Sequence, residues 1–207
     1  MKILSEILLD GENQYQAFFE NTNDQEEIAK TLIAFSNSEG GVLLVGLKKN
    51  GKITGINPEF ENECISHITK ECCSPKIEYN SRVLQLEYRL LLEICVPPYN
   101  SKPVRFINNY KNEIYIRTKK SNLKANKIQE NVWKYKNING LRPNQLLNDD
   151  EVVLNFIISN PKSSLTKLHK NIEYPIDTVD YILVRLICWD IIQMELSELG
   201  CEFSLIN

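Results

Sequence analysis

The sequence has no long apolar run and no sign of a disulfide framework, and both absences narrow the class of protein. No stretch of its 207 residues reaches the roughly 18 uncharged apolar residues that a membrane helix needs. The first ten residues mix charged with apolar side chains, so they lack the apolar core and small-residue cleavage site of a signal peptide. Six cysteines without secretory context are expected to be reduced thiols. We therefore expect a cytoplasmic protein that does not enter a membrane.

Motifs for metals and nucleotides are also missing. Cys64-x-x-His67 offers metal-type ligands, but it lacks the paired C-x-x-C spacing of a zinc site. The alternative is a helix with Cys64 on its buried face. Nothing resembles G-x-x-x-x-G-K-[ST], whose backbone amides and lysine hold phosphates. We expect no metal and no cofactor.

The net charge of −3 conceals a strong asymmetry along the chain. Residues 1–100 carry 9 basic and 15 acidic side chains, residues 101–148 carry 11 and 2, and residues 149–207 carry 4 and 10. A segment with a net charge of +9 is thus set between two segments of −6 each. A concentrated basic segment of this kind is typical of a nucleic-acid contact.

Hydrophobic periodicity predicts an α+β domain in the first two thirds of the chain. Ile28, Leu32 and Phe35 recur at helical spacing, so a helix is expected from Asp24 to Asn37. Gly40-Gly41 ends this helix because glycine accepts the positive φ of a helix C-terminus. The other expected elements are a buried strand over 42–47, a hairpin across Asn50-Gly51, a helix over 58–73, strands at 77–79, 83–86 and 90–96, a hairpin over 104–117, and a closing helix over 125–135. This order predicts a mixed-sheet α+β sandwich.

A polar segment with Gly140 and Pro143 predicts a linker over 139–148, which separates a first domain, 1–138, from a second, 149–207. The second domain is expected to contain three helices and a terminal hairpin, namely Asp150–Ile158, Leu165–Asn171, Asp177–Trp189, and Ile191–Leu196 with Cys201–Ile206. Three helices followed by a hairpin are typical of a small winged helix-turn-helix domain.

The run from Glu27 through Gly41 into Val42–Leu47, completed by Asn50-Gly51-Lys52-Ile53-Thr54-Gly55, resembles the Schlafen AlbA domain family, to which DNA binding is ascribed. The resemblance extends more weakly through Arg105 and Tyr115-Ile116-Arg117 to Trp133. The motif residues that carry it are Phe35, Asn37, Gly40, Gly41, Gly46, Gly51 and Gly55. On physical grounds alone these residues form only a good helix-to-strand junction.

The resemblance implies a nucleic-acid role, as in bacterial transcriptional regulators or in the RNA-cleaving Schlafen proteins. The nuclease uses clustered carboxylates, which could bind a divalent cation and activate water. The family's Glu-x-x-x-x-Glu-Phe-Lys element falls on residues 12–19, where Glu12 matches but Ala17 replaces the second acid and Phe19 the lysine. Lys48-Lys49 stands where a third acid usually follows. One carboxylate holds a hard cation poorly, so we expect no catalysis, with Glu12 as the residual candidate.

The basic segment is the expected nucleic-acid site, because lysine and arginine bind phosphates and the run from Arg117 to Asn122 is expected to be an exposed loop. The alternatives are a charged face that only serves solubility and a face that pairs with the acidic helix expected at residues 59–71. The expected contact residues are Lys102, Arg105, Arg117, Lys119, Lys120, Asn122, Lys124 and Lys127.

The second domain carries the wrong charge for DNA. Its expected recognition helix offers one basic residue, Arg185, beside Asp177 and Asp180, and its hairpin adds three glutamates. We expect this domain to form a dimer or to dock a protein partner. The main hypothesis is a bacterial DNA-binding transcriptional regulator without catalytic activity, which binds DNA or RNA and is dimeric through its C-terminal domain. A residual metal-dependent RNA nuclease and a protein-interaction adaptor are the alternatives.

Overall fold

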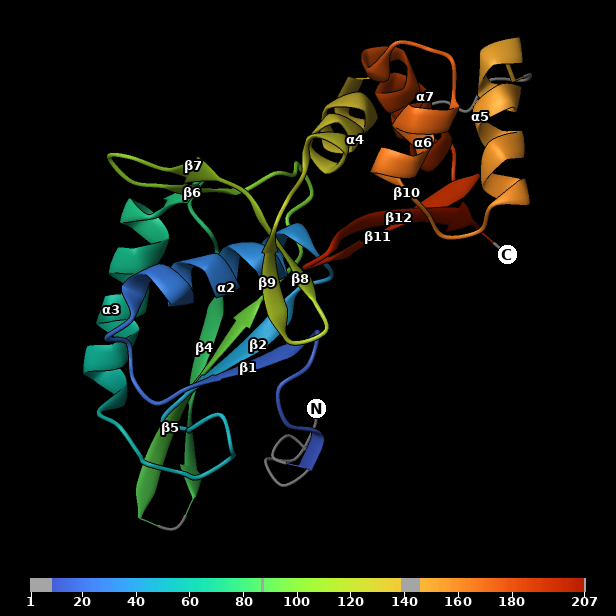
Figure 1. Cartoon of the computed structure of the whole chain (residues 1–207). Helices are drawn as coiled ribbons and strands as arrows, with labels where there is room; N and C mark the ends of the chain where they lie inside the picture. Colours follow the sequence, from blue (N-terminus) through green and yellow to red (C-terminus); the bar gives the residue numbers. More distant parts are fainter. Residues whose placement is uncertain (1–8, 87, 139–145, 207) are drawn as a thin grey trace. The chain divides into compact units, whose positions relative to one another are not determined.

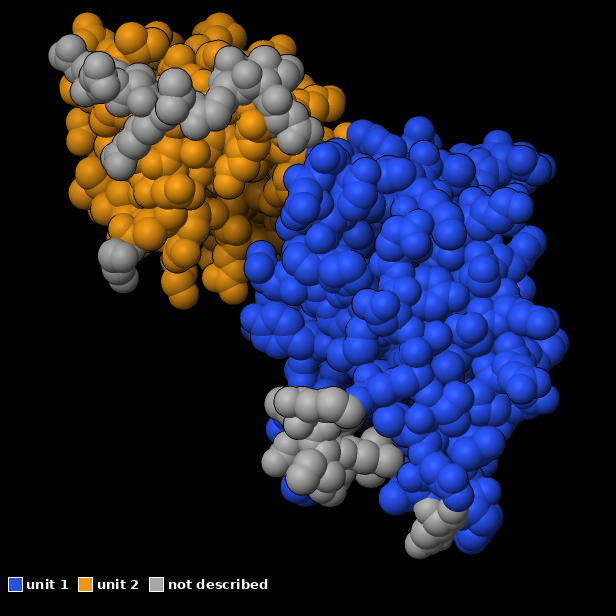
Figure 2. Space-filling model, turned by 180° about the vertical axis from the view of Figure 1, so that it is seen from behind, with its two compact units in different colours: residues 1–125 blue, residues 126–207 orange. Residues whose placement is uncertain are grey.

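The computed structural model describes residues 9–86, 88–138 and 146–206 and divides the chain into two compact units (Figure 2). Unit 1 comprises residues 1–125 and unit 2 comprises residues 126–207. The fold is α+β, and the described part of the chain contains six helices and four small sheets. No helix in this part is long and apolar enough to cross a membrane.

Unit 1 is built on a four-stranded sheet with the order β1-β2-β5-β4 (Figure 1). Strand β1 (Gln16–Phe19) runs parallel to β2 (Gly41–Val45), and β5 (Arg89–Val96) is antiparallel to both β2 and β4 (Asn80–Leu86). Helices α2 (Gln25–Asn37) and α3 (Pro58–Glu71) pack on one face of this sheet.

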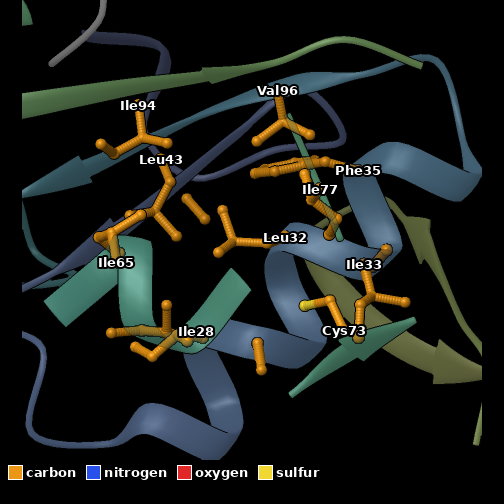
Figure 3. Close-up of a cluster of buried hydrophobic side chains, with 14 of the residues drawn as sticks. Ile28, Leu32, Ile33, Phe35, Leu43, Ile65, Cys73, Ile77, Ile94 and Val96 are labelled. Carbon is orange, nitrogen blue, oxygen red and sulfur yellow. The ribbon is translucent and has the colours of Figure 1, made fainter. Parts of the chain in front are cut away.

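Helix α2 lies at the centre of the core and confirms the helix expected from the spacing of Ile28, Leu32 and Phe35. Asp24 caps its first turn, because the carboxylate accepts a hydrogen bond from the backbone N–H of Glu27 at 3.1 Å. Figure 3 shows how these side chains meet those of the sheet and of α3; the buried set includes Ile33, Leu43, Ile65, Cys73, Ile77, Ile94 and Val96. This core fixes the end of α2, where the family motif lies.

Two smaller sheets complete unit 1. Strand β3 (Cys73–Ser74) pairs with β6 (Arg105–Ile107), which pairs with β7 (Asn112–Glu113). Strands β8 (Tyr115–Thr118) and β9 (Ser121–Lys124) form a separate hairpin with a two-residue turn, and this hairpin packs against α2. The expectation that residues 117–122 form one exposed loop is therefore wrong, because four of them are paired within strands.

Unit 2 contains the expected helices and hairpin, joined by a further helix and a short strand. Its elements are α4 (Lys127–Ile138), α5 (Asn148–Ser159), β10 (Ser163–Ser164), α6 (Leu165–Asn171), α7 (Ile176–Cys188), β11 (Ile192–Ser197) and β12 (Gly200–Leu205). The three strands form an antiparallel sheet with the order β10-β12-β11.

Helix α4 differs from the expectation that it closes the first domain. Its apolar residues Ile128 and Val132 are buried in the core of unit 2, where α4 packs against α7. Ile128 and Val132 are four positions apart, so they lie on the same face of the helix. This apolar face packs against α7. Most of the expected linker, residues 139–145, lies outside the described residues, while Asn148 already begins α5.

Candidate nucleic-acid interface

The motif at the end of α2 is a structural junction. The two glycines leave no room for a side chain: a Cβ on Gly41 would collide with the ring of Phe35, and one on Gly40 would lie 2.7 Å from the carbonyl oxygen of Val96. Gly40 also has a φ of 79°, a conformation in which glycine carries no steric penalty. The helix can therefore turn directly into β2.

Asn37 ties this junction to two later segments of unit 1. Its buried amide donates to the carbonyl oxygens of Val104 at 2.8 Å and Tyr115 at 3.0 Å. Its Oδ1 accepts from the N–H of Val104 at 2.7 Å. These bonds satisfy backbone groups that α2 and the strands leave unpaired, which explains a polar residue at a fully buried position. The asparagine of the motif therefore cross-links the fold.

The other three motif glycines, Gly46, Gly51 and Gly55, lie at the reversal after β2, and all have positive φ. The carbonyl oxygen of Gly46 accepts hydrogen bonds from the N–H and the hydroxyl of Thr54, at 2.8 and 2.9 Å. The predicted hairpin therefore forms here, although only one pair of residues, Leu47 and Ile53, makes a strand bridge. Its turn leaves Lys49 and Lys52 exposed.

Arg117 is buried inside unit 1, with 4% of its surface exposed. Its guanidinium donates to the carbonyl oxygen of Asn13 at 3.2 and 3.3 Å, to that of Gln16 at 3.3 Å, and to Oδ1 of Asn122 at 2.9 Å. The group also lies 5.2 Å from the ring centre of Phe35. Burial lowers the pKa of the Arg117 guanidinium, although the group stays protonated at neutral pH. Because its guanidinium makes four hydrogen bonds inside unit 1 and is buried, Arg117 does not present a free cation to a phosphate.

Asn122 faces inward as well. Its amide donates to the carboxylate of Glu27 at 3.0 Å and to the hydroxyl of Thr31 at 2.8 Å, both on α2. Asn122 and Arg117 together attach the β8–β9 hairpin to α2 and to the start of β1. Two of the eight expected contact residues therefore hold the fold together.

Four more of the expected cations have partners within the protein. Lys102 donates to the carbonyl oxygen of Ser38 at 2.7 Å, and Arg105 lies 3.5 Å from Oδ1 of Asn112. Lys124 pairs with Glu113 at 2.9 Å, and Lys127 pairs with Asp177 at 3.0 Å.

Glu26 of α2 and Glu113 of β7 pair with two cations of the basic segment, Lys111 and Lys124. Glu26 binds Lys111 at 2.5 Å and Lys30 at 2.9 Å, and these two hydrogen bonds lower the pKa of Glu26 to about 2. The pKa of Glu113 is also lowered, first by the hydroxyl of Tyr115 and then by Lys124. Glu26 lies outside the basic segment, so the segment's net charge of +9 did not include it and overstated the free positive charge.

Lys119 and Lys120 remain as exposed cations of the expected site, with no ion-pair partner among the described residues. They form the two-residue turn between β8 and β9. Lys119 has a φ of 51°, a conformation that lysine rarely adopts and that glycine adopts freely. The hairpin below the turn is held by Arg117 and Asn122, so the two charges project from a fixed base.

A family model described as Schlafen, AlbA_2 matches residues 12–126. The chain belongs to the Schlafen AlbA_2 family. This AlbA_2 region ends at residue 126, one residue after the end of unit 1 at Ala125. No curated protein matches the chain.

Two solved structures resemble this AlbA_2 protein. One is the N-terminal domain of a RecG-related protein from Nitrosomonas europaea, with 18% identity and a TM-score of 0.45, covering 57% of this chain and 89% of that chain. The other is the DIP2311 protein from Corynebacterium diphtheriae, with 15% identity and a TM-score of 0.46, covering 96% of this chain and 37% of that chain.

The acidic positions of the AlbA_2 region do not assemble into a metal site in the part of the chain that the structure describes. Glu12 uses its carboxylate to accept the N–H of Phe18 at 3.1 Å. Ala17 is buried in the apolar core, and Lys48 pairs with Glu20 at 3.4 Å.

Outside the AlbA_2 region, the exposed side of α7 is partly covered by α4. Tyr135 of α4 packs edge-to-face on Tyr181 at 6.2 Å, and Lys127 binds Asp177. A groove of about 390 Å³ remains between these helices, lined by both tyrosines and both charged groups. The sequence analysis assigned α4 to the first domain, so it did not predict the contact between α4 and α7.

Proposed function

We propose that the chain binds nucleic acid and that Lys119 and Lys120 contact the phosphate backbone from the β8–β9 turn. The backbone of Lys119 carries the proposal. A lysine with a φ of 51° costs about 1 kcal/mol relative to glycine, so a charged side chain stands where the turn itself favours glycine. Strain of this kind is often kept where a side chain has a function.

The two lysines supply affinity but no base recognition, because phosphate contacts are independent of sequence. Family membership agrees with a nucleic-acid role for this chain. Within this proposal the protein is a non-catalytic, cytoplasmic transcriptional regulator of bacterial type. The replacement of two family acids by Ala17 and Lys48-Lys49, which leaves Glu12 alone, supports the absence of metal-dependent cleavage.

Under this proposal, unit 2 binds a protein partner and does not contact DNA. After α4, its order of helix, strand, two helices and hairpin is typical of a winged helix, and in such a domain α7 would enter the major groove. The exposed Asp177 on α7 would repel phosphates, Asp180 is buried beside His169, and α4 narrows the exposed side of α7. The wing adds Glu195, Glu198 and Glu202, which strengthens the repulsion.

The test measures binding to duplex DNA, single-stranded DNA and RNA over a range of salt concentrations. Lys119→Glu with Lys120→Glu should abolish most binding to every ligand. The matched control, Lys49→Glu with Lys52→Glu, makes the same change of charge on another exposed turn of unit 1 and should retain most of the affinity. Equal losses in both double variants would mean that only net charge matters.

A single variant separates binding from folding. Lys119→Gly removes one charge and relieves the backbone strain, so unit 1 should be no less stable. The slope of log K against log salt should fall by about 0.9 for duplex DNA or about 0.7 for a single strand. If the parent protein binds none of the ligands at low salt, the proposal fails and a role in protein contacts alone remains.

A further inference from the structure

An aromatic side chain lies exposed just before β1. Tyr15 is 56% exposed and belongs to a tight turn whose end residues, Asn13 and Gln16, form a strand bridge. The ring is therefore available at the surface of unit 1. A tyrosine ring at a protein surface offers a face on which a nucleic-acid base can stack.

Hydrogen bonds hold the backbone that carries this ring. The N–H of Asn13 donates to the carbonyl oxygen of Gln16 at 3.0 Å, and the N–H of Tyr15 donates to Oδ1 of Asn13 at 2.7 Å. The carbonyl oxygen of Tyr15 accepts from the N–H of Val42 on β2 at 2.8 Å. Because the backbone is already fixed, a ligand that binds the ring has little more than the side chain to order.

Arg117 joins this turn to the β8–β9 hairpin. Its guanidinium donates to the carbonyl oxygens at both ends of the turn, on Asn13 and Gln16. In the hairpin a single residue, Thr118, separates Arg117 from Lys119. Figure 1 likewise shows the β8–β9 turn beside the start of β1. The tyrosine ring and the two exposed lysines therefore lie at the same end of unit 1.

An exposed ring beside exposed lysines has the composition of a site for single-stranded nucleic acid. Such sites combine cations that contact the phosphates with aromatic rings on which successive bases stack. Duplex DNA offers its phosphates to the lysines, but its bases are stacked on each other inside the helix and do not reach a ring on the protein surface. The ring thus adds affinity only for a strand whose bases are unpaired.

We propose that Tyr15 stacks on a base of a single-stranded nucleic acid whose phosphates lie against Lys119 and Lys120. This inference rests on the proposed phosphate contact of the two lysines and adds the class of ligand, because it predicts that single strands bind more tightly than duplexes. Every base has a face on which a ring can stack, so DNA and RNA strands both fit the site and sequence preference should be slight.

Binding of the full chain to one sequence, prepared as single-stranded DNA, single-stranded RNA and duplex DNA, tests this assignment. Tyr15→Ala should weaken binding of both single strands about tenfold and should change duplex binding by less than about twofold. Tyr15→Phe keeps the ring and should retain the affinity of the parent protein, which separates stacking from a hydrogen bond made by the hydroxyl.

The matched control is Tyr110→Ala. Tyr110 is 94% exposed on the turn between β6 and β7, where its neighbour Lys111 is paired with Glu26. The control removes the same side chain from another turn of unit 1 and should leave every affinity unchanged. Tyr15 is more than half exposed, so Tyr15→Ala should fold, and unchanged amide exchange in β1 and β2 verifies this.

A strand of abasic deoxyribose phosphates keeps the charge of DNA and removes the bases. It should bind the parent protein as weakly as an ordinary strand binds Tyr15→Ala, and Tyr15→Ala should not weaken its binding further. This measurement removes the base instead of the ring, so it tests the same contact from the side of the ligand.

The outcomes separate this inference from the proposed function. Equal affinity of the parent for single strands and duplex, equal losses for both ligands in Tyr15→Ala, or the same loss in Tyr110→Ala would overturn stacking by Tyr15 and leave phosphate binding by Lys119 and Lys120 intact. A parent protein that binds none of the ligands at low salt would overturn both.

Discussion

Replacing Arg117 with leucine should destabilise unit 1 by about 2–4 kcal/mol. The substitution leaves Oδ1 of Asn122 and the carbonyl oxygen of Asn13 without the donors described above, and each orphaned acceptor costs about 1–3 kcal/mol. Loss of the contact with the Phe35 ring adds about 0.5–1 kcal/mol. The added apolar burial of leucine and the removal of a buried charge offset part of this cost.

The assay must follow unit 1 by itself. Both tryptophans, Trp133 and Trp189, lie in unit 2, so tryptophan fluorescence reports on that unit and serves as an internal control. Amide exchange in β1, β2 and β8 reports on unit 1. Arg117→Leu should speed exchange in these strands and leave the fluorescence transition in place, whereas Lys119→Leu should change stability by less than about 0.5 kcal/mol.

The result that would refute this reasoning is specific. If Arg117→Leu costs less than about 1 kcal/mol but weakens nucleic-acid binding more than loss of Lys119 does, the guanidinium contacts the ligand. Arg117 would then be a residue of the binding site, and its hydrogen bonds inside unit 1 would not be its main function.

Two further predictions concern hydrogen bonds made by α2 in unit 1. Asn37→Ala removes the partner of three buried backbone groups on Val104 and Tyr115, and it should cost about 3 kcal/mol, measured by amide exchange in β8. The Glu26 carboxylate should titrate near pH 2 by NMR because Lys111 holds its pKa below the ordinary 4.5. Its stabilising effect is then complete above pH 4.5 and disappears as the pH falls towards 2; Lys111→Ala should return the midpoint towards 4.5, and an unchanged midpoint would contradict the ion pair.

The elements of the fold followed largely from local patterns. The spacing of Ile28, Leu32 and Phe35 predicted α2, and Pro58 marked the first residue of α3. The helices of unit 2 also lie close to their predicted ranges. Such elements depend on periodicity and on turn residues, which are visible within a window of about 15 residues.

The candidate site was harder to predict because residues of the basic segment have partners that are distant in sequence. Glu26 precedes Lys111 by 85 residues, and Asn122 lies 95 residues from its partner Glu27. A count of charges along the chain contains no information on these pairs. For the same reason the pattern could not separate Arg117, which is buried, from Lys119, which is exposed two residues later.

The burial of α4 in unit 2 decides where the protein can be divided for experiments. A fragment that begins after the polar segment, at residue 149, would lack Ile128 and Val132 and would expose the apolar surface of α7 that they cover. We expect such a fragment to aggregate. A cut just before Asn126 keeps both cores whole, so fragments 1–125 and 126–207 are the pair to express when the two units are assayed separately.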